Sequence, residues 1–177
     1  MRKLSYEEIL AERPSEEELN KLPKHKIIVI LDNIRSTYNV GSIFRTCDSS
    51  RIEELLLCGY TPHPPKKELE KTALGALNTV KWQYFKSTNE AIEYAKSKNY
   101  KVFAVELTDN KRFYTDINKD EFPLAVVLGN ELSGIADNVI DNCDDSMEIP
   151  MYGIKHSLNV SVATGIILYE LCRKINS

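Results

Sequence analysis

Polar side chains able to bind or activate a substrate follow three predicted strands of the chain, at residues 27–31, 122–128 and 145–149. In an open sheet of parallel strands, ligands bind beyond the carboxyl ends of the strands. We therefore expect the three polar groups to face one crevice. Their members are Asp32, Asn33, Arg35, Asn39, Gly41 and Arg45 in the first group, Gly129, Asn130, Glu131, Ser133 and Gly134 in the second, and Met151, Gly153, Lys155, His156, Ser157 and Asn159 in the third.

The first group also has a purely structural interpretation. Asn39 is placed to cap a helix expected at residues 39–50. Arg45 is spaced to form an ion pair with Asp48 on the next turn of that helix. The sequence alone leaves the structural and the functional role open for both side chains.

In the second group, Gly129 and Gly134 suit turns. Glu131 would stabilise the N-terminus of a helix expected at residues 131–142. Both interpretations stay open here as well.

The third group is harder to explain by structure alone. Ser157 is a candidate N-cap of an apolar terminal helix, which places Asn159 just inside that helix. A buried asparagine needs hydrogen-bond partners. This requirement favours a functional role for Asn159.

Strands and helices alternate along the chain, which predicts an α/β fold with a mostly parallel sheet covered by helices on both faces. Ser5 and Ser15 each precede a glutamate at capping-box spacing, so residues 1–25 are expected to form a short helical extension before one domain at residues 26–177. The predicted strands lie at residues 27–31, 54–59, 80–85, 101–107, 122–128 and 145–150, and the predicted helices at 39–50, before 76, at 87–99, at 131–142 and from 157 onward.

The composition restricts the class of partner. The formal net charge is −3, so a nucleic-acid site would have to be a local basic patch. No stretch reaches the roughly 18 apolar residues of a membrane span. The first 26 residues carry charges throughout, without the apolar core of a signal peptide. We expect a cytoplasmic protein that does not enter a membrane.

Common metal and nucleotide sites are disfavoured. No CxxC pair occurs, so we expect free thiols and no metal site. No GxGxxG follows the first strand and no GxxxxGK[ST] or GxSxG occurs, which argues against dinucleotide, P-loop and hydrolase sites. The cysteines are Cys47, Cys58, Cys143 and Cys172, and the histidines are His25, His63 and His156.

The three polar groups lie within motifs whose order resembles the SpoU-type branch of the SPOUT superfamily, which comprises RNA ribose 2′-O-methyltransferases. The likeness extends over nearly the whole chain from about residue 25, and "KTALGA" at residues 71–76 is similar to the tRNA-methylating branch. The three motifs are "NIRSTYNVGSIFRT" at residues 33–46, with NxGxxxR as Asn39, Gly41 and Arg45, "LGNELSG" at residues 128–134, and "IPMYGIKHSLNVSVATGIILYE" at residues 149–170.

The resemblance implies S-adenosyl-L-methionine as cofactor, a deep trefoil knot at the C-terminus, and a homodimer with its active site at the subunit interface. It also implies that backbone groups hold the adenine while apolar side chains pack on its faces. The residues assigned to the cofactor in this way are Val105, Glu106, Leu107, Gly129, Ile149, Met151, Ser157 and Leu158.

The resemblance assigns catalysis to Arg45, supported by Asn39, Glu131, Ser157 and Asn159. Arg45 is the usual candidate base of the family, although an arginine side chain is essentially always protonated. The alternative is that Arg45 stabilises the developing alkoxide and the adjacent phosphate while another acceptor or water takes the proton. Both roles stay open at this point.

The expected partner is structured RNA, with tRNA favoured over rRNA. A dimer that binds RNA without catalysis is an alternative, as is a base-methylating enzyme of the same superfamily. The RNA-binding candidates are Arg35, Lys66, Lys67 and Lys155, with Lys24, Lys26, Arg51, Lys111 and Arg112 as further members of the same basic patch.

Overall fold

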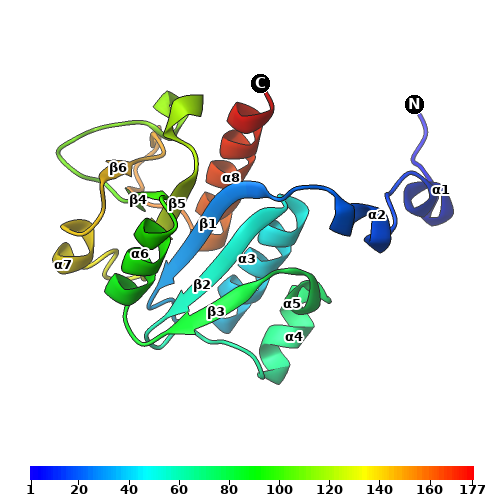
Figure 1. The fold of residues 1–177 in the computed structure, drawn as a ribbon, viewed down its shortest axis with the longest axis horizontal. Helices are drawn as coiled ribbons and strands as arrows, with labels where there is room; N and C mark the ends of the chain where they lie inside the picture. The colour runs from blue at the N-terminus through cyan, green and yellow to red at the C-terminus, as the bar shows by residue number, and fades with distance from the viewer.

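The computed structural model describes all 177 residues except the side chains of Glu16 and Asn20. Its centre is a six-stranded sheet in the order β3-β2-β1-β5-β4-β6, in which each neighbouring pair is parallel (Figure 1). The predicted α/β class with a parallel sheet is therefore confirmed. The strands are β1 (His25–Asp32), β2 (Ile52–Cys58), β3 (Trp82–Phe85), β4 (Lys101–Val105), β5 (Leu124–Leu128) and β6 (Asp145–Met147).

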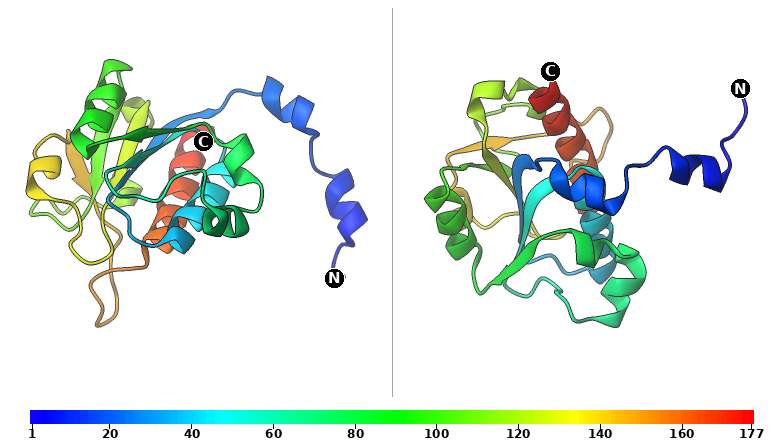
Figure 2. Two further views of the ribbon diagram at one scale, coloured as in Figure 1. Left: turned by 90° about the horizontal axis from the view of Figure 1, so that it is seen from below. Right: turned by 45° about the vertical axis from the view of Figure 1, so that its right-hand side comes forward.

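Helices cover both faces of the sheet, as predicted, because alternate side chains of β1 enter different cores. Ile27, Val29 and Leu31 pack with apolar residues of α3, α4, α5 and α8. Ile28 and Ile30 pack with residues of α6 and α7. Figure 2 shows α6 and α7 on one side of the sheet and α3 and α8 on the other. The helices are α3 (Thr37–Ser49), α4 (Lys67–Ala73), α5 (Ala76–Thr79), α6 (Thr88–Ser97), α7 (Asp137–Ile140) and α8 (Val160–Asn176).

The two N-terminal helices, α1 (Tyr6–Ala11) and α2 (Glu16–Lys21), form with the predicted capping boxes. They lie apart from the sheet (Figure 1). The Arg51 guanidinium connects α2 to the domain by donating to the Leu19 carbonyl at 3.0 Å and the Leu22 carbonyl at 2.8 Å. None of the described helices has the length and apolar character to cross a membrane.

Three local predictions were wrong, one in the extent of a helix and two in the residue that caps a helix. The helix expected at residues 131–142 is limited to α7, since Asn130 Oδ1 accepts from the amides of Leu132 and Ser133 and holds a turn there. Ser36, not Asn39, caps α3. Asn159, not Ser157, caps α8, so Asn159 lies before the helix and not inside it.

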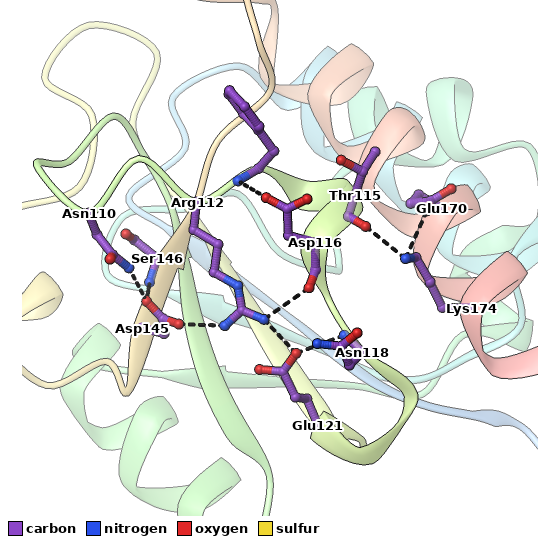
Figure 3. A network of polar contacts seen from close by, with 11 residues as sticks. Asn110, Arg112, Thr115, Asp116, Asn118, Glu121, Asp145, Ser146, Glu170 and Lys174 are labelled. Carbon is purple, nitrogen blue, oxygen red and sulfur yellow. Dashed lines mark hydrogen bonds and ion pairs between the residues drawn. The ribbon is translucent and has the colours of Figure 1, made fainter.

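The segment between β4 and β5 is anchored by Arg112, which is 20% exposed and does not form a free basic surface (Figure 3). Its guanidinium binds the Asp145 carboxylate at 2.6 Å and the Glu121 carboxylate at 2.5 Å. The Glu148 amide donates to the Arg112 carbonyl at 2.8 Å. The segment, with its short 3₁₀ turns η1 (Tyr114–Asp116) and η2 (Lys119–Glu121), is thereby fixed against β6 and the residue that follows β6.

Gly41, the glycine of the NxGxxxR motif, is required by the packing of α3 on α4. A Cβ atom at this position would lie 2.5 Å from Thr72 Cβ and 3.2 Å from the Ala73 amide nitrogen. Neither atom belongs to the end of a flexible side chain. The glycine therefore allows the first motif to contact the "KTALGA" segment closely.

We predict that Gly41→Ala destabilises the protein. Overpacking of a well-packed site costs about 1–3 kcal/mol, more than the roughly 0.8–1 kcal/mol gained by removing a glycine from a helix. Urea denaturation measures the difference. Ser42→Ala, at the next position of α3, serves as the control and should change the unfolding free energy by less than about 0.5 kcal/mol. Unchanged or increased stability of Gly41→Ala would contradict this account of the packing.

Candidate functional site

A pocket of about 700 Å³ lies where the segments after β4, β5 and β6 meet the start of α8. Its lining includes residues from parts of the chain that are far apart in sequence. Among them are all eight residues that the sequence assigned to the cofactor: Val105, Glu106, Leu107, Gly129, Ile149, Met151, Ser157 and Leu158. The structure brings these residues together, and their binding of a cofactor stays a prediction.

One wall of the pocket is a tight loop after β5. Asn130 and Gly134 exchange backbone hydrogen bonds of 3.1 and 2.9 Å. Gly134 has φ +67°, and a Cβ there would lie 2.5 Å from Glu106 Oε2. Glu106 accepts from the Ile135 amide at 3.1 Å and from the Leu107 amide at 3.0 Å. The Glu106 carboxylate thus joins the segments that follow β4 and β5 in the lining of the pocket.

The opposite wall is the segment at residues 149–158, which extends away from the sheet as a loop (Figure 2). Within the described structure, its amides and carbonyls make no backbone–backbone hydrogen bond. Tyr152 and Ile154 are fully exposed, whereas Ile149 and Met151 are half-buried and line the pocket. The segment therefore offers free backbone donors and acceptors beside apolar side chains, a combination suited to a flat heterocycle.

A chain of hydrogen bonds connects Glu131, Asn39 and Asn159 beside the pocket. Asn39 Nδ2 donates to Glu131 Oε1 at 2.9 Å, and Asn159 Nδ2 donates to Asn39 Oδ1 at 3.1 Å. Glu131 also accepts from the backbone amides of Arg35 at 2.9 Å and Ser36 at 3.1 Å. Three of the predicted catalytic residues are thus in direct contact, and they hold the three polar loops together.

The Glu131 carboxylate is stabilised in its charged form. Partial burial alone would raise the pKa of this carboxyl, but the hydrogen bonds from the Arg35 amide, the Asn39 side chain and the Ser36 amide outweigh burial. The pKa therefore lies below its ordinary value. Glu131 remains an acceptor at neutral pH and keeps the orientation of the Asn39 amide fixed.

Arg45 does not line this pocket. It lies in a separate groove of about 1130 Å³, formed by α3, the α4–α5 segment and the N-terminal extension, and the two cavities share no lining residue. The ion pair between Arg45 and Asp48, which the structural interpretation required, does not occur among the described side chains. Asp48 instead accepts a hydrogen bond from Thr79 Oγ1. Arg45 is exposed. Within one chain, the predicted catalytic set is therefore incomplete at the pocket.

The predicted RNA-binding residues fall into two classes. Arg35, Lys66, Lys67 and Lys155 are exposed and available, as is Lys111. Lys24 and Lys26 are exposed too, but Lys24 donates to the Thr79 carbonyl at 3.4 Å and Lys26 lies 3.8 Å from the Glu53 carboxylate. The expectation was wrong for Arg51 and Arg112, because their guanidinium groups bind carbonyls and carboxylates of the protein itself. Backbone carbonyls and acidic partners distant in sequence could not be identified from local charge alone.

Sequence reasoning missed Tyr60 and Glu148. Tyr60 contacts Asn130, and Glu148 lines the pocket next to Ile149. Neither belongs to a motif, and only their positions just after strands would have indicated them. No set of three or more His, Cys, Asp or Glu side chains placed to hold a metal ion occurs in the described part of the chain, and the four thiols are free.

Comparison with curated proteins shows consistent similarity to RNA-modifying enzymes. A tRNA (guanosine(18)-2′-O)-methyltransferase of Aquifex aeolicus is 32% identical over 151 residues, which cover 84% of this chain and 69% of that protein. The enzyme of the same name from Thermus thermophilus is 29% identical over 93% of this chain and 83% of its own length. The chain spans only 58% of a TrmH family relative from Staphylococcus haemolyticus, at 35% identity.

Solved structures show the same fold. The A. aeolicus TrmH/SpoU tRNA modifying enzyme matches with a TM-score of 0.77 and 30% identity, over 86% of this chain and 77% of that chain. An rRNA methyltransferase from Sinorhizobium meliloti, crystallised with AdoMet, matches with a TM-score of 0.80 and 27% identity, over 88% and 59%. The model of the SpoU rRNA Methylase family matches residues 26–169. The chain therefore belongs to the SpoU rRNA methylase family.

Proposed function

We propose that this protein transfers a methyl group from S-adenosylmethionine to a ribose 2′-oxygen of structured RNA, with tRNA as the favoured substrate. The observation that carries the proposal is the pocket, in which all eight residues expected at the cofactor line one cavity of about 700 Å³. Family membership supports the same activity. Two of the relatives are named tRNA (guanosine(18)-2′-O)-methyltransferases, which favours tRNA over rRNA as the substrate.

The residues present fit the cofactor. Ile149, Met151 and Leu158 offer apolar contacts for the faces of an adenine, and the backbone of residues 149–158 offers free donors and acceptors for its edge. When bound, S-adenosylmethionine supplies a methyl group activated by a sulfonium. Gly129 and Gly134 line the pocket where the backbone is tightly packed, since a Cβ at Gly129 would lie 2.5 Å from the Gly134 carbonyl carbon.

A second copy of the chain would complete the site. Arg45 lies outside the pocket of its own chain, so a partner is needed to bring an arginine to it. α8 supports such a dimer, because Val162 and Tyr169 expose apolar side chains along one face, 51% and 57% exposed. Gly165, between them, would have no atom within 4 Å of an added Cβ. The dimer, the trefoil knot and a cytoplasmic location stay predictions.

Arg45 is proposed to stabilise charge during transfer. The attacking 2′-hydroxyl loses its proton and becomes negatively charged, and a guanidinium, essentially always protonated, is suited to bind that oxygen and the adjacent phosphate. Another acceptor or water would take the proton. Asn39, Glu131 and Asn159, which are in contact, would orient the ribose and the loops around it. Ser157, which lines the pocket, is placed to contact either ligand.

We predict that the wild-type chain binds S-adenosylhomocysteine at one site per chain, unaffected by a chelator. Met151→Ala and Leu158→Ala should each raise the dissociation constant by roughly 10-fold, since a buried apolar contact of this size contributes about 1.5 kcal/mol or more. Calorimetry gives both values. Tyr152→Ala is the matched control, because Tyr152 is adjacent to Met151 yet 94% exposed. If the wild-type protein does not bind S-adenosylhomocysteine at millimolar concentration, the proposed function is contradicted.

We predict that Arg45→Ala lowers the methyl-transfer rate by about 10²–10³-fold, the scale for loss of one preorganised stabilising group. Affinity for S-adenosylhomocysteine should stay unchanged, because Arg45 is proposed to contact the ribose and phosphate of the RNA and is not among the residues assigned to the cofactor. Arg45→Lys should keep part of the activity, since a cation remains. Single-turnover transfer to tRNA measures the rate. Lys96→Ala, on α6 over the opposite face of the sheet, is the control. Wild-type turnover in Arg45→Ala would remove Arg45 from the mechanism.

A further inference from the structure

Three aromatic rings are exposed near the carboxyl ends of β2 and β3: Tyr60 and His63 follow β2, and Tyr84 is the second-last residue of β3. Tyr60 is 61% exposed and Tyr84 is 43% exposed, and His63 is also exposed. The rings of His63 and Tyr84 have their centroids 4.6 Å apart and are tilted by 45°. Tyr84 Oη donates to the Gly59 carbonyl, immediately before Tyr60, at 2.9 Å. We refer to Tyr60, His63 and Tyr84 as the aromatic platform.

The two tyrosines are oriented in an uncommon way for surface residues. An exposed tyrosine usually places its hydroxyl in water and its ring against the protein. Here the Tyr60 hydroxyl accepts from Asn130 Nδ2 at 2.7 Å, and the Tyr84 hydroxyl is bound to a backbone carbonyl. The polar ends are therefore held by the protein while the rings remain accessible to solvent.

The platform is held rigidly by its neighbours. The Tyr60 amide donates to Asn33 Oδ1 at 3.2 Å. Gly59, with φ +61°, forms the turn before it, in a conformation that favours glycine. A ring that is already fixed loses little conformational entropy when a ligand stacks on it.

The platform is directly connected to the candidate site. Asn130, which holds the Tyr60 hydroxyl, is only 7% exposed and lines the cofactor pocket. The same side chain accepts from the amides of Leu132 and Ser133 and so forms the loop that carries Glu131. A molecule stacked on Tyr60 would therefore lie next to the loop that binds Asn39.

Cations that could bind an anionic ligand are exposed in the segments at the same edge of the sheet as the platform, although Glu68 and Glu70 are exposed there as well. Arg35, Lys66, Lys67 and Lys86 are all exposed and lie in the segments that follow β1, β2 and β3. Proteins bind unpaired nucleotides with accessible aromatic rings and nearby cations. The bases stack on the rings, and the cations bind the phosphate backbone.

We propose that Tyr60, His63 and Tyr84 form a stacking platform for unpaired bases of the substrate RNA, beside the nucleotide that is methylated. This inference rests on the proposed function, which it deepens by assigning the recognition of single-stranded RNA to a surface outside the three motifs. The bases flanking the target would stack on the rings, and the surrounding cations would bind their phosphates.

The test compares leucine and phenylalanine variants at the two tyrosines. Tyr60→Leu and Tyr84→Leu keep apolar volume without a flat ring and should each weaken binding of fluorescently labelled bulk tRNA by about 10-fold. Tyr60→Phe and Tyr84→Phe keep the ring and should bind within about 2-fold of wild type. The salt dependence of RNA binding distinguishes base stacking from phosphate binding. Only the Lys66→Ala, Lys67→Ala double variant should reduce the slope of the logarithm of the RNA association constant against the logarithm of salt concentration.

Several outcomes would overturn the platform. If both leucine variants bind RNA with unchanged affinity, the platform does not contact RNA. If light scattering shows that the leucine variants are monomers, the surface is an interface between copies of the chain and not an RNA site. Cross-linking of the wild-type protein to tRNA containing 4-thiouridine does not depend on the folding of any variant. Adducts at Tyr60, His63 or Tyr84 are expected, and their absence would contradict the proposal.

The platform and the proposed function can fail separately. A wild-type protein that binds S-adenosylhomocysteine and methylates RNA, with leucine variants that bind RNA normally, would remove the platform alone. A wild-type protein that binds RNA through these rings but does not bind S-adenosylhomocysteine would remove the proposed methyl transfer and leave the platform in place.

Discussion

The hydrogen bonds from Asn159 to Asn39 and from Asn39 to Glu131 connect three loops that are far apart in the chain. Both polar atoms of the Asn39 amide are used, one as donor and one as acceptor, so its orientation is fixed. Each bond contributes only about 0.5–1.5 kcal/mol, and less where water competes. Their importance is geometric, because they place the exits of β1 and β5 against the start of α8.

This connection and the parallel sheet together determine where chemistry can occur. All strands end at one edge, and the loops there are held both by Glu106 in the lining of the pocket and by the Asn39 bridge beside it. α3 begins at the bridge and carries Arg45 roughly 9 Å further along its axis, at 1.5 Å per residue. The packing of Gly41 on Thr72 keeps that helix in place. The backbone at Arg45 is thus fixed by the packing of α3, but Arg45 lines a different cavity from the residues predicted to bind the cofactor.

Much of this organisation could be predicted from the sequence. The continuous β-branched run of β1 indicated a buried parallel strand, and the Ser5 and Ser15 capping boxes predicted α1 and α2. The motif residues of the pocket were found through resemblance. Predictions from local sequence patterns were wrong where a side chain forms hydrogen bonds or ion pairs that the pattern does not reveal. Asn130 replaced a predicted helix by a turn, and Arg112 was taken for free charge because its partners Glu121 and Asp145 are distant in sequence.

Separation of Arg45 from the pocket makes the assembly of the active site the decisive question, since each chain would hold one half of two shared sites. A purified heterodimer, with Arg45→Ala in one chain and Leu158→Asp in the other, tests this most directly by single-turnover methyl transfer. If Arg45 acts on the partner's pocket, one intact site forms and the heterodimer has about half of wild-type activity, while both parent homodimers are nearly inactive. A heterodimer as inactive as its parents would contradict the shared site.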